Sequence, residues 1–218
     1  MLAATLLGSS MAFIDGTAVN VALPTLQRSL GASAAGAQWV VEAYALFLAA
    51  LILVGGSLGD RLGRRRVYVA GVVVFAAASV WCGVSPSIGW LIAGRALQGI
   101  GGALLVPGSL AIISATFLET ESRGRAIGTW SGATAITSAV GPVLGGWLVD
   151  NASWRWVFFL NLPLVALVVA IALTKVPESR DTQSAGRIDV AGATLATLGL
   201  AGLLVGMIEA PGRGWGDP

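Results

Sequence analysis

The sequence predicts an all-α integral membrane protein, and three observations lead to that fold class. The chain of 218 residues is 56% hydrophobic and 11% charged, and its mean hydropathy is +0.82. A soluble domain is about 45–50% apolar and about 25% charged, so both fractions indicate a membrane protein. The apolar residues fall into seven long segments, and the 30 glycines lie largely inside them. Glycine at such positions lets transmembrane helices pack closely.

Each apolar segment is about 20 residues long, which is enough for a helix to cross a hydrocarbon core of about 30 Å. The first has no basic flank and no clear cleavage site, so we interpret it as a transmembrane helix rather than a signal peptide. The fourth is long for one crossing and contains Pro107, which is expected to kink it. In chain order, the predicted segments are 3–23, 39–59, 67–85, 88–117, 126–149, 156–174 and 188–208.

The spacing of these segments predicts the domain organisation. Residues 1–174 hold six segments and are predicted to form one six-helix unit. The polar residues 175–187 are predicted to be a cytoplasmic linker before the seventh helix at 188–208. Residues 209–218 are expected to be an outer tail without structure of its own. We interpret the chain as truncated, because the seventh helix begins a unit that the sequence does not complete.

Lys and Arg favour the cytoplasmic ends of transmembrane helices, so their distribution predicts the orientation. The connections after the second, fourth and sixth segments contain nine of the 13: Arg61, Arg64, Arg65, Arg66, Arg123, Arg125, Lys175, Arg180 and Arg187. The other side has three, Arg28, Arg155 and Arg213, and Arg95 lies within a segment. The N-terminus is therefore predicted to be cytoplasmic. The alanine- and glycine-rich composition favours a bacterial inner membrane as the cell membrane concerned.

Several classes of site are excluded by residues that the sequence lacks. Cys82 is the only cysteine, which excludes an internal disulfide and a CxxC metal site. The chain has no histidine, the commonest metal ligand and general base, and no GxxxxGK[ST] phosphate-binding loop. The net charge of +2 is small. We therefore expect no enzyme activity, no metal or other cofactor and no nucleic-acid partner. The expected partner is the lipid bilayer.

An internal repeat relates the two halves of the six-helix unit. Residues 55–68, GGSLGDRLGRRRVY, align with residues 145–158, GGWLVDNASWRWVF, at an offset of 90 residues. The identical residues Gly55, Gly56, Leu58, Asp60, Arg65 and Val67 recur as Gly145, Gly146, Leu148, Asp150, Arg155 and Val157. Three segments separate the copies, so the copies are expected on opposite sides of the membrane. This predicts an inverted three-plus-three repeat, which is typical of transporters; the alternative is a chance likeness in a biased composition.

Asp15 and Arg95 are ionisable residues that lie deep within predicted segments, where such residues are rare and usually functional. Asp15 is twelve residues from the inner end of its segment. That is about 18 Å from the cytoplasmic edge at about 1.5 Å per residue. Arg95 is seven residues from the outer end of the fourth segment, which puts it about 20 Å from the same edge in a core of about 30 Å. The two side chains are therefore predicted to meet.

A buried pair of this kind has two interpretations. In the first, Arg95 would keep Asp15 ionised, while desolvation opposes the ionisation of this carboxyl group. A cationic substrate arriving at Asp15, or a helix movement that parts the pair, would then make Asp15 release or capture a proton. Alternatively, the pair is a static salt bridge between two helices. Glu42, which is shallower, is either a second acidic site facing a cavity or a residue that reaches the headgroups. Asn20 and Gln98 are interpreted as residues that form helix-packing hydrogen bonds.

Four motifs together indicate a known family. They are IDGTAVNVALP (14–24), GSLGDRLGRRR (56–66), RALQGIGGALLVPG (95–108) and GPVLGG (141–146), and WRWVFFLNLP (154–163) is a further likeness. In this order they resemble the fourteen-helix drug:proton antiporter branch of the major facilitator superfamily. The resemblance covers essentially the whole chain. It implies a six-helix N-terminal half with inverted three-plus-three repeats, plus one further transmembrane helix. The missing second half is then an expected partner.

The resemblance implies a conformational latch in the loop between the second and third helices. Gly56 and Gly59 are expected to let the end of the second helix pack closely against a neighbour. Asp60 is disfavoured at the C-terminal end of its own helix dipole and is expected to face the N-terminus of a helix in the missing half. The arginines are expected to hold the loop in the cytoplasm and to bind acidic partners, or else they are only a topology signal. The predicted latch residues are Gly56, Gly59, Asp60, Arg61, Gly63, Arg64 and Arg65.

The GPVLGG motif has a local explanation beside the one that the resemblance implies. Gly141 and Gly145 form a GxxxG face for close helix packing, and Pro142 is expected to bend the fifth helix. The resemblance implies that this motif, which includes Gly146, favours exchange and limits leak. Ordinary close packing of the glycines is the alternative.

Together with Asp15 and Arg95, the resemblance implies a transporter that exports drugs or toxic small molecules in exchange for protons, by alternating access. Acidic residues in the cavity favour cationic substrates. The alternatives are an importer or a metabolite exporter on the same scaffold, or a truncated membrane fragment that transports nothing alone.

Overall fold

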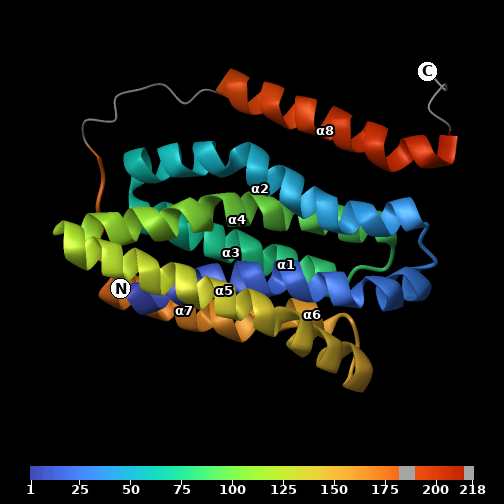
Figure 1. The fold of residues 1–218 in the computed structure, drawn as a ribbon, viewed down its shortest axis with the longest axis horizontal. Helices are drawn as coiled ribbons and strands as arrows, with labels where there is room; N and C mark the ends of the chain where they lie inside the picture. Colours follow the sequence, from blue (N-terminus) through green and yellow to red (C-terminus); the bar gives the residue numbers. More distant parts are fainter. Residues whose placement is uncertain (182–189, 214–218) are drawn as a thin grey trace.

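The computed structural model describes residues 1–181 and 190–213. Within these residues the chain forms helices joined by short connections, and it forms no strand (Figure 1). The helices are α1 (Leu2–Leu30), α2 (Ala34–Leu62), α3 (Arg64–Gly83), α4 (Ile88–Thr116), α5 (Thr120–Asn151), α6 (Trp156–Phe159), α7 (Asn161–Lys175) and α8 (Val190–Arg213). The predicted all-α fold class is confirmed.

Six helical stretches of the described chain are long and apolar enough to cross a membrane, which confirms the first six predicted segments. α6 and α7 together make the sixth of them, Trp156–Lys175. The helices extend past the apolar segments: α1 continues through Pro24 and ends before Gly31, whose φ of 60° is a left-handed value that favours glycine. α2 then begins after Ser33, whose Oγ accepts a hydrogen bond from the Gly36 N–H at 3.0 Å.

The seventh predicted segment corresponds to α8, whose apolar part covers Thr194–Ile208. The helix continues to Arg213, so it enters the region 209–218 that was predicted to be an unstructured tail. Residues 182–189 of the predicted linker and residues 214–218 of the predicted tail lie outside the described residues. The division into a six-helix unit, a linker and a tail therefore stays a prediction.

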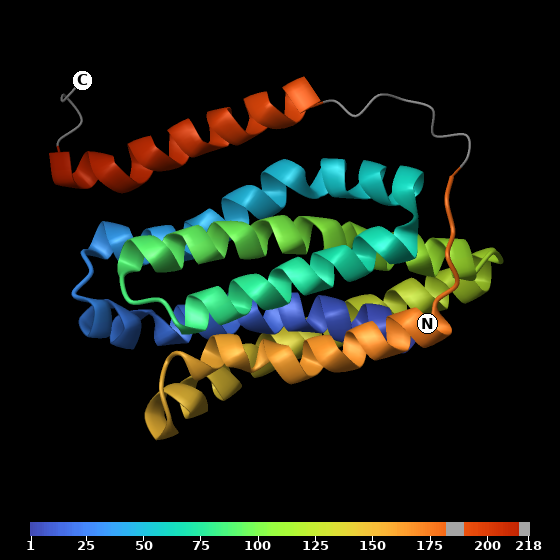
Figure 2. The ribbon, with the colours of Figure 1, turned by 180° about the vertical axis from the view of Figure 1, so that it is seen from behind.

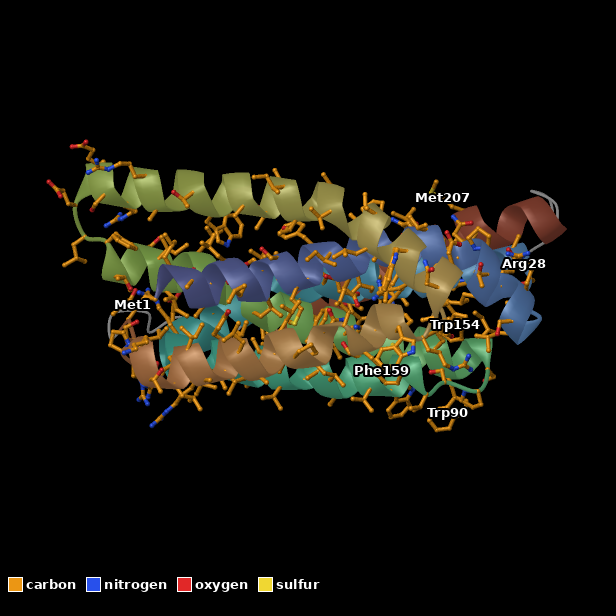
Figure 3. All side chains as sticks on the ribbon, turned by 90° about the horizontal axis from the view of Figure 1, so that it is seen from below. Met1, Arg28, Trp90, Trp154, Phe159 and Met207 are labelled. Atoms are coloured by element: carbon orange, nitrogen blue, oxygen red, sulfur yellow. The ribbon has the colours of Figure 1, made fainter. Side chains whose placement is uncertain are left out.

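The long helices lie side by side in one bundle (Figures 1 and 2). α2 and α3 pack against α4, α1 packs against α5, and α8 lies along α2 at one edge of the bundle. Figure 3 places Arg28, Trp90, Trp154 and Met207 at the end of the bundle opposite Met1. Those tryptophans therefore lie at the end that the charge distribution predicts to be outside.

The packing of α1–α3 is repeated by α4–α7. α5 packs against α1 as α2 packs against α4. This correspondence is expected if α4, α5 and α6–α7 repeat the arrangement of α1, α2 and α3. A Cβ at Gly55 of α2 would lie 2.7 Å from the Ala103 carbonyl carbon of α4, and a Cβ at Gly145 of α5 would lie 2.9 Å from the Ala18 Cα of α1. The 90-residue offset relates Gly55 to Gly145. The inverted three-plus-three repeat is therefore confirmed.

Two arginines related by the same offset join the third helices of the two units. Arg65, at the start of α3, donates from Nη1 to the Val176 carbonyl oxygen just after α7, at 3.1 Å. Arg155, just before α6, donates from Nη2 to the Ser85 carbonyl oxygen just after α3, at 3.1 Å. Each unit thus holds the C-terminal end of the other unit's third helix.

The core consists of two apolar clusters with polar residues between them. One cluster includes Met11 and Phe75, and the other includes Val19 and Trp154. Asp15 lies between Met11 and Val19 along α1 and is fully buried. A polar side chain in this position needs partners from the surrounding helices, because burying an unpaired charge is costly.

Candidate functional site

Asp15 on α1 and Arg95 on α4 form an ion pair in the interior of the bundle. Arg95 Nη1 donates to Asp15 Oδ2 at 2.5 Å, and both side chains are 0% exposed. Charged side chains are almost never fully buried unless they are paired. The structure thus brings together the two residues that their depths in the sequence predict to meet.

The Asp15 carboxylate also accepts hydrogen bonds from two amide side chains. Gln98 Nε2 donates to Asp15 Oδ1 at 3.1 Å, and Asn161 Nδ2 donates to the same oxygen at 2.8 Å. Both amides donate to Ser79 Oγ as well, at 2.9 Å from Gln98 and at 3.2 Å from Asn161. Asp15 is therefore the acceptor at which α1, α4 and α7 meet, with α3 joined through Ser79.

Arg95 is bound on its other side by α2. Its Nε donates to the Val40 carbonyl oxygen at 2.9 Å, and its guanidinium lies over the Tyr44 ring, 4.4 Å from the ring centroid. An aromatic face stabilises a desolvated cation. Arg95 Nη1 also donates to Gln98 Oε1 at 2.8 Å. The charge network therefore connects α1, α2, α3, α4 and α7.

The structure extends the site beyond the residues that the sequence singles out. The sequence singles out Asn161 only as part of a familiar motif, although its side chain binds Asp15 directly. Gln98 forms the helix-packing hydrogen bonds predicted for it, and Asp15 is one of its acceptors. The sequence does contain a signal for Asn161, because a polar amide inside an apolar segment, here FFLNLP, indicates a buried hydrogen-bonding residue. Asn20 does not form the predicted helix-packing hydrogen bond within the described chain: it is exposed, and its Nδ2 donates to the Gly16 carbonyl oxygen of its own helix at 3.2 Å.

Glu42 is not part of this network. Its side chain is half-buried on α2, and it forms no hydrogen bond or ion pair with a residue that the structure describes. The role of Glu42 as a second acidic site stays a prediction.

The loop between α2 and α3 is bound by the segment that follows α7. Gly63 has a φ of 115°, a left-handed value that favours glycine, and a Cβ there would lie 2.6 Å from Glu178 Oε1. That oxygen accepts a hydrogen bond from the Arg65 N–H at 3.1 Å. Glu178 Oε2 lies 3.8 Å from Arg65 Nε and 3.7 Å from Arg66 Nε. Glu178, which the sequence analysis missed, is thus an acidic partner of the loop arginines.

Backbone hydrogen bonds reinforce this contact. The Arg64 N–H donates to the Ser179 carbonyl oxygen at 2.9 Å, and the Asp181 N–H donates to the Asp60 carbonyl oxygen at 3.0 Å. The Asp60 carboxylate pairs with Arg64 Nη2 at 2.8 Å. Within the described chain Asp60 is thus bound by its own loop, and its contact with the missing half stays a prediction.

Within the described chain, the glycine at the end of α2 that permits close helix contact is Gly55. A Cβ at Gly56 would make an ordinary contact of 3.9 Å with Pro107, and a Cβ at Gly59 would meet nothing within 4 Å. Neither glycine makes a close helix contact within the described chain, so their close packing against a neighbour stays a prediction. α2 instead turns its Gly55 side toward the α4 backbone at Ala103.

Replacing Glu178 with glutamine is expected to loosen the loop. The amide keeps the shape of the side chain but removes the charge that Arg65 and Arg66 bind. A partly exposed pair of this kind is worth about 1 kcal/mol, so trypsin is expected to cleave the loop about five times faster. Glu121→Gln is the matched control, because the exposed Glu121 pairs with Arg125 of its own helix, at 3.7 Å, and not with a described residue of the loop. Equal cleavage rates in both variants would contradict the role of Glu178.

The GPVLGG motif of α5 packs against α1. A Cβ at Gly141 would collide with Thr17 Oγ1 and lie 3.1 Å from the Ile14 carbonyl oxygen, while Gly146 has only an ordinary contact with Val21 at 3.7 Å. Together with Gly145, Gly141 therefore forms the close helix contact that the GxxxG spacing predicts. α5 continues as one helix through the exposed Pro142.

Comparison with known proteins places this fold and these motifs in a family. Residues 5–212 match the Major Facilitator Superfamily. The chain is 44% identical over 214 residues to the multidrug resistance protein Stp of Mycobacterium tuberculosis, covering 98% of this chain and 40% of Stp. It is 41% identical over 205 residues to the puromycin resistance protein pur8 of Streptomyces alboniger, covering 94% of this chain and 40% of that protein.

The fold matches solved structures of transporters. The peptide transporter POT in complex with sulfate superposes with a TM-score of 0.72 at 15% identity, covering 99% of this chain and 47% of that one. The chain thus spans less than half the length of these relatives, in agreement with a six-helix half and one further helix. This multi-pass membrane protein belongs to the Major Facilitator Superfamily.

Proposed function

We propose that the complete protein is a proton-driven exporter of drugs or other toxic small molecules that works by alternating access. The observation that carries this proposal is the fully buried pair of Asp15 and Arg95. The resistance names of the relatives Stp and pur8 support export as the activity. The superfamily consists of transporters rather than enzymes.

Proton binding at Asp15 is the step that we assign to coupling. As a carboxylate, Asp15 accepts hydrogen bonds from Arg95, Gln98 and Asn161, which hold α1 to α4 and α7. A proton on this carboxylate, or a cationic substrate beside it, weakens these bonds, because hydrogen bonds to an ionised acceptor are the stronger ones. α1 then moves more easily against α4 and α7, and the bonds form again when the proton leaves.

Two buried polar atoms support a second arrangement of the network. Arg95 Nη2 and Asn161 Oδ1 have no hydrogen-bond partner within the described chain. A buried polar group without a partner is costly, and it calls for an explanation. When Asp15 carries a proton, rotation of the Asn161 amide presents Oδ1 as the acceptor for the new O–H. Asn161 thereby stabilises both protonation states of Asp15.

The remaining parts of the proposal concern the whole molecule. The N-terminus lies in the cytoplasm of a cell, and the loop between α2 and α3 lies on the same side. Asp60 binds the second transporter half in one conformation, and that half completes the substrate cavity. Glu42 is a second acidic site in the cavity, and the GPVLGG motif on α5 limits leak.

The test is to replace Asp15 with asparagine in the complete chain. Efflux of a cationic dye driven by a proton gradient is expected to fall by about tenfold or more, because an amide does not bind and release a proton at neutral pH. Asp150→Asn is the matched control, since Asp150 is exposed at the end of α5. Efflux at the wild-type rate in the Asp15→Asn variant would contradict the coupling role.

A further inference from the structure

Two adjoining hollows lie on the outer surface of α3, close to the loop that Glu178 binds. One has a volume of about 370 Å³ and is lined by Arg61, Arg66 and Arg180 together with apolar residues. The other has a volume of about 570 Å³ and continues along α3 past Val69 and Val73 to Leu173 of α7. Arg66 and Ala70 line both hollows. They therefore form one groove, which we call the α3 groove, with a basic end and an apolar end.

The basic end has more positive than negative charge. Neither Arg61 nor Arg180 forms an ion pair with a residue in the described ranges. The Arg66 side chain is 65% exposed, and its contact with Glu178 is long, at 3.7 Å, and shared with Arg65. The Asp60 carboxylate forms an ion pair with Arg64, with 2.8 Å between Asp60 Oδ1 and Arg64 Nη2. Among the described residues of this region, five arginines stand against three acidic residues, which leaves a net positive charge: Arg61, Arg64, Arg65, Arg66 and Arg180 against Asp60, Glu178 and Asp181.

The apolar end suits a hydrocarbon chain. Val73 is 51% exposed and Leu173 is 56% exposed, and both lie on membrane-spanning helices. A soluble anion would contact only the arginines, whereas an amphiphile with a phosphate group and acyl chains would contact both the basic and the apolar end of the groove. Arginine is well suited to phosphate, because its planar guanidinium donates two parallel hydrogen bonds. Basic pockets beside transmembrane helices on the cytoplasmic side are places where anionic headgroups bind.

We propose that the α3 groove binds an anionic phospholipid, with the phosphate between Arg61, Arg66 and Arg180 and an acyl chain along Val73 and Leu173. These arginines come from the end of α2, the start of α3 and the segment after α7. The bound lipid therefore adds a further link between the two three-helix units, beside the contacts of Glu178 and the backbone hydrogen bonds. The site does not depend on what the protein transports.

The experiment is native mass spectrometry of the complete chain in detergent, titrated with phosphatidylglycerol and, separately, with phosphatidylcholine. Wild type is expected to retain phosphatidylglycerol in preference to phosphatidylcholine. Arg66→Gln/Arg180→Gln is expected to weaken phosphatidylglycerol binding by at least about tenfold, through the loss of two cationic contacts. Arg28→Gln/Arg125→Gln changes the net charge equally at exposed arginines outside the groove and is expected to bind like wild type.

Two results would overturn the proposal. One is equal retention of phosphatidylglycerol by the two double variants. The other is displacement of the lipid by millimolar inorganic phosphate, which would show a site for a soluble anion instead. If Arg66→Gln/Arg180→Gln proves unstable, phosphatidylglycerol binding is measured with the single variant Arg180→Gln instead. This substitution is not expected to unfold the protein, because Arg180 is exposed and forms no ion pair with a described residue.

Discussion

Arg95→Leu is expected to cause the largest loss of stability of the variants considered, at neutral pH. The substitution removes the cation that pairs with the fully buried Asp15, and it also removes the hydrogen bonds to Val40 and Gln98. Breaking a buried pair by removing one partner costs about 3–5 kcal/mol. Whole domains are stable by only about 5–15 kcal/mol. In detergent, the Tm from a fluorescence melt is expected to fall by about 10 °C.

The double variant Asp15→Leu/Arg95→Leu separates pairing from the loss of arginine itself. Because it leaves no unpaired carboxylate, it is expected to recover a large part of the stability that Arg95→Leu loses. Arg125→Leu is a control, since the Arg125 side chain is 74% exposed and its removal is expected to change stability by less than about 0.5 kcal/mol. If Arg95→Leu melted at the wild-type temperature, the buried pair would not exist in the folded protein.

Gly55→Ala is expected to have the next largest effect, by forcing α2 and α4 apart. The new Cβ would collide with the carbonyl oxygen of Ala103 and lie 2.7 Å from its carbonyl carbon. A backbone group inside a helix does not move aside as a flexible side chain does. Overpacking of this kind costs about 1–3 kcal/mol or more, so the same fluorescence melt is expected to show a clear loss of stability.

Gly59→Ala and Gly56→Ala are the matched controls on the same helix. A Cβ at Gly59 meets nothing within 4 Å, and a Cβ at Gly56 makes only an ordinary contact at 3.9 Å. Both variants are expected to melt like wild type, and replacing glycine by alanine within a helix adds some intrinsic helix propensity. A Gly55→Ala variant as stable as these two would mean that α2 and α4 do not approach as closely as the structure shows.

The features that follow from one segment at a time could be predicted from the sequence. Hydropathy alone located the six crossing helices, because segment length and bilayer thickness are directly related. The meeting of Asp15 and Arg95 followed from counting helical rise from opposite edges of the membrane. The inverted repeat was visible because its two copies keep the glycines that each unit needs for close packing, Gly55 and Gly145.

The features that depend on which helices are neighbours could not be predicted in this way. Asn161 binds Asp15 only because α7 packs against α1, and no spacing in the sequence gives that contact. Glu178 binds the Arg65 N–H across 113 residues. The close contact at Gly55 rather than Gly56 depends on the rotation of α2 about its axis. A shift of one residue on a helix changes the facing direction by about 100°.

The hydrogen bonds between α3 and the α6–α7 helix have a mechanical consequence. They join the two at three heights: Arg65 to Val176 at one end, Asn161 Nδ2 to Ser79 Oγ at 3.2 Å between them, and Arg155 to Ser85 at the other end. Two helices fastened at both ends and at a third point between the ends resist sliding along each other and changing their crossing angle. The hydrogen bonds therefore fasten α3 to the α6–α7 helix along most of the length of these two helices. α3 and the α6–α7 helix are thus expected to move as one body in any rearrangement of the bundle.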